Sequence, residues 1–270
     1  MRQHMLGNRA IARGLYEAGC SFVSSYPGTP STEITEEAAK FPEIYAEWAP
    51  NEKVAAEAAL GASIAGARSF CAMKHVGLNV AADLLYTAAY TGVNGGMVLA
   101  VADDPGMHSS QNEQDSRHHA IAAKVPMLEP SDAQECKDFT MEAFHLSEAF
   151  DTPVMLRTCT RVAHSQSLVT PGQRQQIPLK AYVKNPAKYS MVPANAVRRH
   201  VQVEERLDAL WELAETTPLN RMELDDTSVG FITSGICYEY IKEVFPHASV
   251  LKLGWCIRCP DGCLPLLHKA

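Results

Sequence analysis

Four stretches of this sequence place polar and ionisable side chains directly after apolar, strand-like runs. Carboxyl, imidazole and ammonium groups gathered in this way can exchange protons with an organic molecule or hold its carboxylate. In an open parallel sheet, ligands bind outside the carboxyl ends of the strands, so we expect the four stretches to meet at one edge. They are residues 26–30, 51–52, 74–79 and 103–106.

Glu52 is the strongest candidate for acid–base chemistry. Asn51 is a favourable N-cap residue, which places Glu52 in the first turn of a helix built almost entirely of Ala and Gly over 55–67. A helix with so little side-chain bulk predicts close packing and burial, and burial raises the pKa of a carboxyl group more than a helix dipole lowers it. Glu57, five residues on, points to another side of the helix. The alternative is an ordinary first-turn Glu favoured by the dipole.

Familiar phosphate-binding and hydrolase fingerprints are missing. The sequence has no G-x-G-x-x-G after a strand, no Walker sequence and no G-x-S-x-G turn. We therefore expect that these residues do not bind a phosphate group of the ligand at this edge.

Composition narrows the class of protein. The chain has 270 residues, 46% of them hydrophobic and 20% charged, which is typical of a globular protein with a substantial core. Its net charge of -7 and lack of basic runs argue against nucleic-acid binding. Since the sequence shows neither an apolar run of membrane-spanning length nor a signal-peptide pattern at its start, we expect no membrane association and a cytoplasmic location.

The eight cysteines fall into two groups. Isolated cysteines within apolar or helical patterns are expected to be reduced core thiols. Three others form a C-x2-C-x3-C run near the last residue, for which zinc or an iron–sulfur cluster would need a fourth ligand that only His268 could supply. We therefore expect no metal site there. The isolated cysteines are Cys20, Cys71, Cys136, Cys159 and Cys237, and the run consists of Cys256, Cys259 and Cys263.

Strand-like and helical patterns alternate through the first 164 residues. Six apolar runs read as strands, and crossover helices separate them, which predicts an α/β fold with a doubly wound parallel sheet. The run 96–102 is apolar throughout, as in a strand buried on both faces. The other predicted strands are 21–26, 44–49, 69–73, 126–129 and 153–157.

The pattern changes after residue 164. Residues 165–225 read as a linker followed by an amphipathic helix over 196–216, and 226–254 read as the first βαβ unit of a second α/β domain. Two strands and one helix cannot bury their own faces, so we expect this domain to be truncated. Residues 255–270 are expected to be an irregular tail.

The motifs around these residues strongly resemble the N-terminal part of the large (alpha) subunit of indolepyruvate:ferredoxin oxidoreductases, over about residues 5–253. The Tyr-Pro-x-Thr-Pro pattern at 26–30 is shared across 2-oxoacid:ferredoxin oxidoreductases. Lys-His-Val-Gly-Leu-Asn at 74–79 and Ala-Asp-Asp-Pro-Gly at 102–106 indicate the indolepyruvate branch. The resemblance implies a thiamine diphosphate enzyme whose pyrimidine-binding domain is residues 1–164, with 226–254 opening a domain like the transketolase C-terminal one.

On the cofactor side, the resemblance assigns Glu52 to the aminopyrimidine ring. A carboxyl that donates to a ring nitrogen favours the imino tautomer, which then removes the C2 proton to give the ylide. Pro27, Gly28 and Thr29 would line the cofactor, with the Thr29 hydroxyl near the thiazolium and the substrate. The alternative for Thr29 is a plain turn residue.

On the substrate side, Lys74 and His75 are candidates to hold the 2-oxoacid carboxylate, and solvated loop charges are the alternative. Asp103, Asp104 and Arg117 are weaker substrate candidates, because an ion pair within a loop explains them equally well.

The implied reaction is the oxidative decarboxylation of indolepyruvate and other aryl pyruvates to aryl-acetyl-CoA with reduction of ferredoxin. The implied partners are a 2-oxoacid, CoA, ferredoxin and a beta subunit in a hetero-oligomer. The family's domain for the diphosphate and Mg²⁺ and its segment for 4Fe-4S clusters have no counterpart here, so we expect a fragment that is inactive alone. Alternatives are a non-catalytic interface subunit, or the same domain of another thiamine diphosphate enzyme such as a sulfopyruvate-type decarboxylase.

Overall fold

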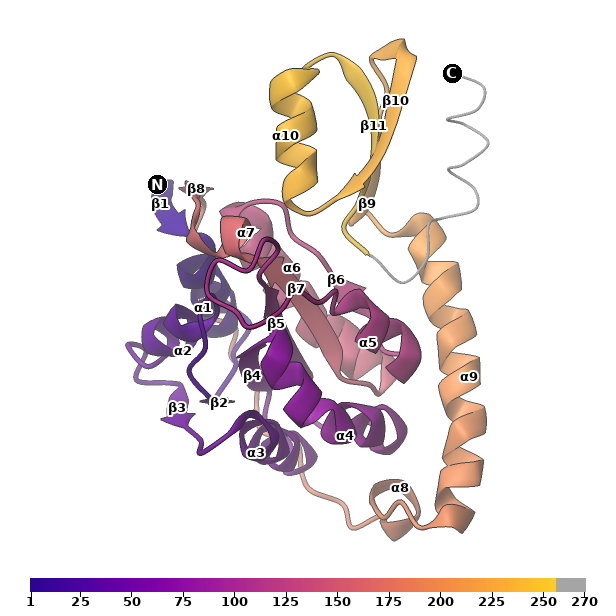
Figure 1. Ribbon diagram of the computed structural model, residues 1–270. Coiled ribbons are helices and arrows are strands. Elements are labelled where there is room, and N and C mark those ends of the chain that lie inside the picture. The colour runs from indigo at the N-terminus through magenta and orange to yellow at the C-terminus, as the bar shows by residue number, and fades with distance from the viewer. Residues whose placement is uncertain (256–270) are drawn as a thin grey trace.

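The computed structural model describes residues 1–255, so Cys256, Cys259, Cys263 and nearly all of the predicted tail lie outside the described residues. The centre of the protein is a six-stranded sheet in the order β3-β2-β4-β5-β7-β6, with every neighbouring pair parallel (Figure 1). This confirms the predicted doubly wound sheet. The strands are β2 (Phe22–Ser25), β3 (Tyr45–Trp48), β4 (Ser69–Lys74), β5 (Met97–Asp103), β6 (Met127–Leu128) and β7 (Val154–Cys159).

Helices cover both faces of this sheet because the strand residues alternate between the two sides. In β4, Phe70 and Ala72 belong to one buried cluster, whereas Cys71 and Met73 belong to the other. Every residue of β5 is buried, as its uninterrupted apolar sequence predicts. The first face carries α1 (Gly7–Glu17), α2 (Thr32–Ala38) and α6 (Ala133–Phe150), and the second carries α3 (Glu52–Ile64), α4 (His75–Thr91) and α5 (Arg117–Ala123).

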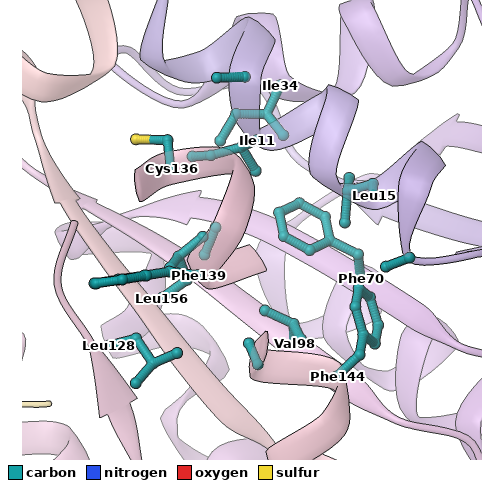
Figure 2. Packing of buried hydrophobic residues seen from close by; sticks show 14 of the residues in the cluster. Ile11, Leu15, Ile34, Phe70, Val98, Leu128, Cys136, Phe139, Phe144 and Leu156 are labelled. Atoms are coloured by element: carbon teal, nitrogen blue, oxygen red, sulfur yellow. The ribbon is translucent and has the colours of Figure 1, made fainter. Parts of the chain in front are cut away.

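The larger side chains of the core lie on the first face. Figure 2 shows aromatic and branched side chains of α1, α2 and α6 packed against those of the central strands. Phe144 of α6 is fully buried beside this sheet, and the Arg68 guanidinium lies 5.5 Å from its ring centroid. The second face, in contrast, is packed mainly with Ala, so its helices approach the sheet and one another closely.

The remaining segments differ in part from the sequence reading. The expected linker begins with a strand, β8 (Gln166–Val169), which pairs antiparallel with β1 (Gln3–Leu6). This pairing joins segments far apart in sequence, and local patterns do not reveal it. Residues 165–190 also contain α8 (Pro186–Tyr189), and α7 (Thr160–His164) precedes them. The predicted amphipathic helix is α9 (Pro193–Thr216), which runs beside the sheet domain (Figure 1).

Beyond α9 lies a smaller unit with its own sheet. Its strands follow the order β10-β11-β9, in which β10 and β11 are parallel and β9 pairs antiparallel with β11. The predicted strands and helix of a βαβ unit are therefore present, and β9 is an additional strand that the sequence reading missed. The elements are β9 (Asn220–Glu223), β10 (Asp226–Ser234), α10 (Ile236–Val244) and β11 (Ala248–Leu253).

Backbone and buried ionic contacts join this unit to the first sheet. Leu128 forms a bridge with Trp255, and the Glu129 N–H donates to the carbonyl of Gly254 at 2.8 Å. Lys252 is fully buried, where its ammonium donates to the Ser131 hydroxyl at 2.7 Å and pairs with Glu135. Burial lowers the pKa of Lys252 although Glu135 opposes the effect.

Replacing Phe144 by Ala should lower the free energy of unfolding by about 3–5 kcal/mol, because the fully buried ring would leave a cavity between α6 and the sheet. Val197, exposed on α9, offers a control whose change to Ala should alter it by less than about 0.5 kcal/mol. Chemical denaturation measures both, and equal losses would contradict this account of the core.

Candidate active site

The order of the strands has a switch point between β2 and β4. These strands are neighbours, but the helices that follow them, α2 and α4, lie on opposite faces of the sheet. Such a switch point separates the two helices and leaves room for a ligand. The turn after β2 meets the end of β4 here, since a Cβ added at Gly28 would lie 3.2 Å from Cδ of Lys74. Two of the predicted site stretches are thus in contact.

Hydrogen bonds fix the backbone of the turn after β2. The Gly28 N–H donates to Oγ1 of Thr32 at 3.0 Å, and the Gly28 carbonyl accepts from the N–H and the hydroxyl of Ser31 at 2.9 and 2.8 Å. Pro27 and Thr29 are exposed at this edge. Hydrogen bonds within the turn therefore fix its backbone, and the side chains of Pro27 and Thr29 remain available to contact a ligand.

Glu52 lies at the start of α3 and reaches the first turn of α4. The Asn51 side chain accepts from the Val54 N–H at 3.0 Å, as predicted for an N-cap. A Cβ added at Gly77 would lie 2.5 Å from Oε1 of Glu52 and 2.8 Å from its carboxyl carbon. Burial raises the pKa of the Cys71 thiol, and the nearby charge of Glu52 adds to this rise. The carboxyl group thus rests where the glycine leaves space.

The expected burial of the small-residue helix on every face is wrong for the chain by itself, whereas Glu52 lies at the edge of the packed interface, as expected. The inner face of α3, which includes Ala55, Ala56 and Ala59, is buried against β2, β4 and α4. Its outer face, with Val54 and Glu57, is exposed in the part of the chain that the structure describes, and Glu52 is half-buried. Small residues permit close packing on every side of a helix, but they do not ensure that a partner covers each side.

Lys74 and His75 both bind the loop 104–116 that follows β5. The Lys74 ammonium donates to the carbonyl of Ser109 at 2.7 Å. His75 is fully buried, and its Nε2 lies 2.9 Å from the carbonyl oxygen of Asn112. A carbonyl only accepts, so Nε2 must carry the proton of this contact. Nδ1 of His75 has no hydrogen-bond partner among residues 1–255. His75 is therefore not a solvated loop charge, whereas Lys74 remains partly exposed.

Asp103 and Asp104 anchor the same loop. Asp103 is fully buried and accepts from the Ser116 N–H and from Nε of Arg157 at 3.1 and 2.7 Å. Asp104 accepts 2.7 Å hydrogen bonds from the Thr160 hydroxyl, the Ser109 N–H and the Ser110 hydroxyl. Burial alone would raise the pKa of Asp104, but these hydrogen bonds outweigh it and lower the pKa to about 2. Such contacts favour a loop-fixing role for both aspartates over substrate binding.

Arg117 also pairs within the protein. Its guanidinium donates to Asp115 at 2.9 Å and makes two bonds with Glu129, at 2.8 and 3.0 Å. Arg157, buried next to it, donates to the same Glu129 at 2.5 Å. The sequence reading missed Glu129 and Arg157, although an arginine inside an otherwise apolar strand already indicates a buried ionic partner. The ion-pair alternative for Arg117 is the one that this geometry supports.

Other polar chemistry is sparse in the described part of the chain. Residues 1–255 contain no group of three or more His, Cys, Asp or Glu side chains placed to hold a metal ion. Cys20, Cys71, Cys136 and Cys159 are buried free thiols as expected, but Cys237 is exposed in the first turn of α10. None of the helices described has the length and apolar character needed to cross a membrane.

A doubly wound parallel sheet with an acidic side chain at its ligand-binding edge is compatible with a cofactor-binding domain, and comparison with known proteins shows which class of domain it is. The family model described as pyruvate flavodoxin/ferredoxin oxidoreductase, thiamine diphosphate-binding, matches residues 13–212. The chain therefore belongs to the 2-oxoacid:ferredoxin oxidoreductase family. A solved 2-oxoglutarate:ferredoxin oxidoreductase from Magnetococcus marinus has the same fold, with a TM-score of 0.79, 19% identity and coverage of 99% of this chain and 56% of that one.

The chain is more similar in sequence to indolepyruvate oxidoreductase subunits. It is 45% identical to subunit IorA of Methanothermobacter marburgensis over 97% of this chain and 44% of the relative. It is 44% identical to subunit IorA of Pyrococcus horikoshii over 96% of this chain and 42% of the relative. The chain thus spans less than half the length of these curated relatives.

The packing of Glu52 on Gly77 predicts that Gly77→Ala moves the carboxyl group without unfolding the protein. The clash is with the end of a flexible side chain, and Ala stabilises a helix interior by up to about 1 kcal/mol relative to Gly. A crystal structure of the variant should show Glu52 displaced from α4. As a control, Gly61→Ala should leave Glu52 in place, because a Cβ there meets nothing within 4 Å. An unmoved Glu52 in Gly77→Ala would refute the proposed packing.

Because the pKa of Asp104 is lowered to about 2, the free energy of unfolding should depend on pH in the acidic range. The usual pKa of Asp is about 3.9, so the stabilisation from ionised Asp104 is present above pH ~4 and is lost as the pH falls towards ~2. In Asp104→Asn, the free energy of unfolding should therefore fall less steeply with decreasing pH across this window. Urea unfolding at several pH values measures the two slopes, and equal slopes would contradict the assignment.

Proposed function

We propose that this chain supplies the pyrimidine-binding half of the active site in an enzyme that oxidatively decarboxylates indolepyruvate and other aryl pyruvates. The products are aryl-acetyl-CoA and carbon dioxide, and ferredoxin accepts the electrons. The observation that carries the proposal is the Glu52 carboxyl at the start of α3, set against Gly77 at the switch point between β2 and β4. The similarity to indolepyruvate oxidoreductase subunits supports the choice of substrate.

The residues at this edge suit the cofactor that the family binds. Gly77 leaves the carboxyl group of Glu52 a defined position, and the Gly28 turn presents Pro27 and Thr29 at the same edge of the sheet. Bound at this edge, thiamine diphosphate would supply a nucleophilic carbon and an electron sink for the decarboxylation of a 2-oxoacid. Glu52 holds a proton at its carboxyl oxygen for the aminopyrimidine ring, and Pro27, Gly28 and Thr29 line that side of the cofactor.

Glu52 can hold this proton only if its carboxyl group is shielded from water, because desolvation favours the neutral acid. In the described chain it is half-buried, and the outer face of α3 beside it is exposed. A second domain or subunit seated on that face would complete the burial. We assign to that partner the binding of the diphosphate and Mg²⁺, and to other parts of the assembled enzyme the 4Fe-4S clusters and the CoA and ferredoxin contacts.

The substrate carboxylate would approach the end of β4. Lys74 is partly exposed there and brings a positive charge within reach of the Gly28 turn. His75 is buried, and through Nε2 it holds the loop at Asn112. In this proposal Lys74 attracts the 2-oxoacid carboxylate, His75 fixes the loop beside it, and the Thr29 hydroxyl faces the reacting carbon.

Glu52→Gln in the assembled enzyme tests the proposal. The amide cannot donate a carboxyl proton, so 2-oxoacid-dependent ferredoxin reduction should fall by about 10²–10⁴-fold while thiamine diphosphate remains bound. Glu57→Gln is the matched control, since Glu57 lies exposed on the same helix within 4.0 Å of Lys53. It should retain wild-type turnover. Unchanged turnover in Glu52→Gln would leave this chain with the alternative role of a non-catalytic interface subunit.

A further inference from the structure

Asn8 joins α1 to the turn that carries Thr29. It is the second residue of α1, and its side chain is fully buried. Its Nδ2 donates to the carbonyl of Pro30 at 2.7 Å and to Oε2 of Glu33 at 2.8 Å. Pro30 directly follows the exposed Thr29, and Glu33 lies in the first turn of α2. One amide group thus holds both the end of the turn and the start of the helix after it.

The chemistry of these two partners fixes which way the amide of Asn8 points. A carbonyl oxygen and a carboxylate oxygen only accept hydrogen bonds, so the NH₂ group must face them. The flipped amide would instead set its own oxygen against these two oxygens. With the NH₂ group engaged, Oδ1 of Asn8 is buried and has no hydrogen-bond partner among residues 1–255.

Asn8 is unfavourable for α1 taken alone. Asn is less favourable than Ala within a helix by up to about 0.7 kcal/mol, and Asn8 does not cap this helix, because the N-cap position is Leu6. A buried acceptor without a donor costs about 1–3 kcal/mol in addition. The contacts that offset these costs are the two hydrogen bonds of Asn8, and both lead out of α1 to the turn and to α2.

The start of α1 is a rigid base for these bonds. β1 leads directly into α1 and pairs with β8, and the Gly7 N–H donates to the carbonyl of Ser165 at 3.2 Å. A Cβ added at Gly7 would lie 2.0 Å from the carbonyl oxygen of Val162, so α1 begins in direct contact with α7. Ile11 of the same helix is fully buried in the core. Asn8 therefore ties the turn to a fixed part of the fold.

The hydrogen bonds within the turn do not provide this attachment. The bonds of Gly28 link residues at most four apart in sequence, so they set the shape of the turn. The bond from Asn8 to Pro30 spans 22 residues and sets where the turn lies relative to α1. Because Thr29 immediately precedes Pro30, a shift of the Pro30 carbonyl moves the Thr29 hydroxyl at the edge of the sheet.

We propose that Asn8 is a positioning residue that holds the turn 27–30 through the Pro30 carbonyl, and so sets where the Thr29 hydroxyl lies on the substrate side. For its effect on turnover this rests on the proposed function, in which that hydroxyl faces the reacting carbon. The attachment of the turn to α1 rests on the contacts of Asn8. Since Asn8 is fully buried, it acts on the substrate only through the turn.

Two other side chains provide matched controls. Glu33→Ala removes the carboxylate partner of Asn8 but leaves the Pro30 carbonyl, and so separates the two bonds. Asn94 lies before β5, at the edge of the sheet opposite to the turn, and its Nδ2 also donates to two backbone carbonyls, both at 3.2 Å. Asn94→Ala therefore removes a comparable pair of bonds away from the candidate site.

Hydrogen exchange of the protein as isolated tests the attachment without any need for turnover. In Asn8→Ala, the amides of Gly28 and Ser31 should exchange roughly tenfold faster or more, as expected for the loss of buried hydrogen bonds. Asn8→Asp keeps the size of the side chain and so leaves no cavity. A carboxyl group has at most one proton for the two acceptors, so this variant should also speed exchange of both amides.

The controls decide whether the effect belongs to the turn. Asn94→Ala should keep wild-type protection of the Gly28 and Ser31 amides, and Glu33→Ala should reduce it less than Asn8→Ala does. Wild-type protection of these amides in both Asn8 variants would overturn the attachment. An equal loss of protection in Asn8→Ala and in either control would overturn it as well.

A double-mutant cycle in the assembled enzyme tests the consequence for turnover. Asn8→Ala should lower kcat for the 2-oxoacid roughly tenfold and change KM much less, because Lys74, the proposed carboxylate contact, keeps its place. In a Thr29→Ala background the same change should lower kcat by less than about twofold, since the group that Asn8 positions is already absent. Equal effects in the two backgrounds would overturn the proposal, and Asn94→Ala should leave kcat unchanged. Failure of the proposed function would appear separately, as normal turnover in Glu52→Gln.

Discussion

The close approach of α3 to α4 is the constraint on which the candidate site depends. Glu52 can lie against α4 because position 77 has no side chain, and α3 can reach β2 and β4 because its inner face is made of alanines. Alanine packing contributes less hydrophobic stabilisation per residue than larger side chains do. The larger residues of the opposite face, among them Phe70 and Phe144, compensate by filling the core between the sheet and α1, α2 and α6. The face with the larger side chains thus stabilises the sheet against which α3, with the candidate residue Glu52, is packed.

Much of this architecture could be predicted from local sequence. All six strands of the main sheet were placed because each is a short apolar run bounded by turn residues, and Asn51 acts as the N-cap that its type predicts. The strands β1, β8 and β9 were missed, since each is four residues long and is defined by pairing with a distant segment. Such pairings follow from tertiary packing and leave little local signal.

The site was less predictable than the fold, because the pairing of its charged side chains depends on tertiary structure. Sequence position places Glu52, Lys74, Asp104 and Arg117 at one edge, but it does not reveal which charges bind one another. Asp104 accepts hydrogen bonds from three donors and Arg117 pairs with two acids, whereas the hydrogen bond of Lys74 within residues 1–255 goes to the backbone carbonyl of Ser109. The burial of the outer face of α3 was overestimated, because small residues show how closely a neighbour can approach a helix but not whether a neighbour is present.

The polar residues at this edge of the sheet thus fall into two groups: those that fix the backbone around them, and those that remain available to a ligand or partner. A charged group whose bonds are all made within the chain fixes the backbone around it, since releasing it for a ligand would leave its buried partner unpaired. Asp103, with Arg157 and Ser116, meets this criterion. A half-buried group beside an exposed helix face, such as Glu52, can become fully desolvated only when something else packs there. The fixed residues hold the loop and the turn in place, so that the proposed assembly with a partner would change mainly the environment of Glu52.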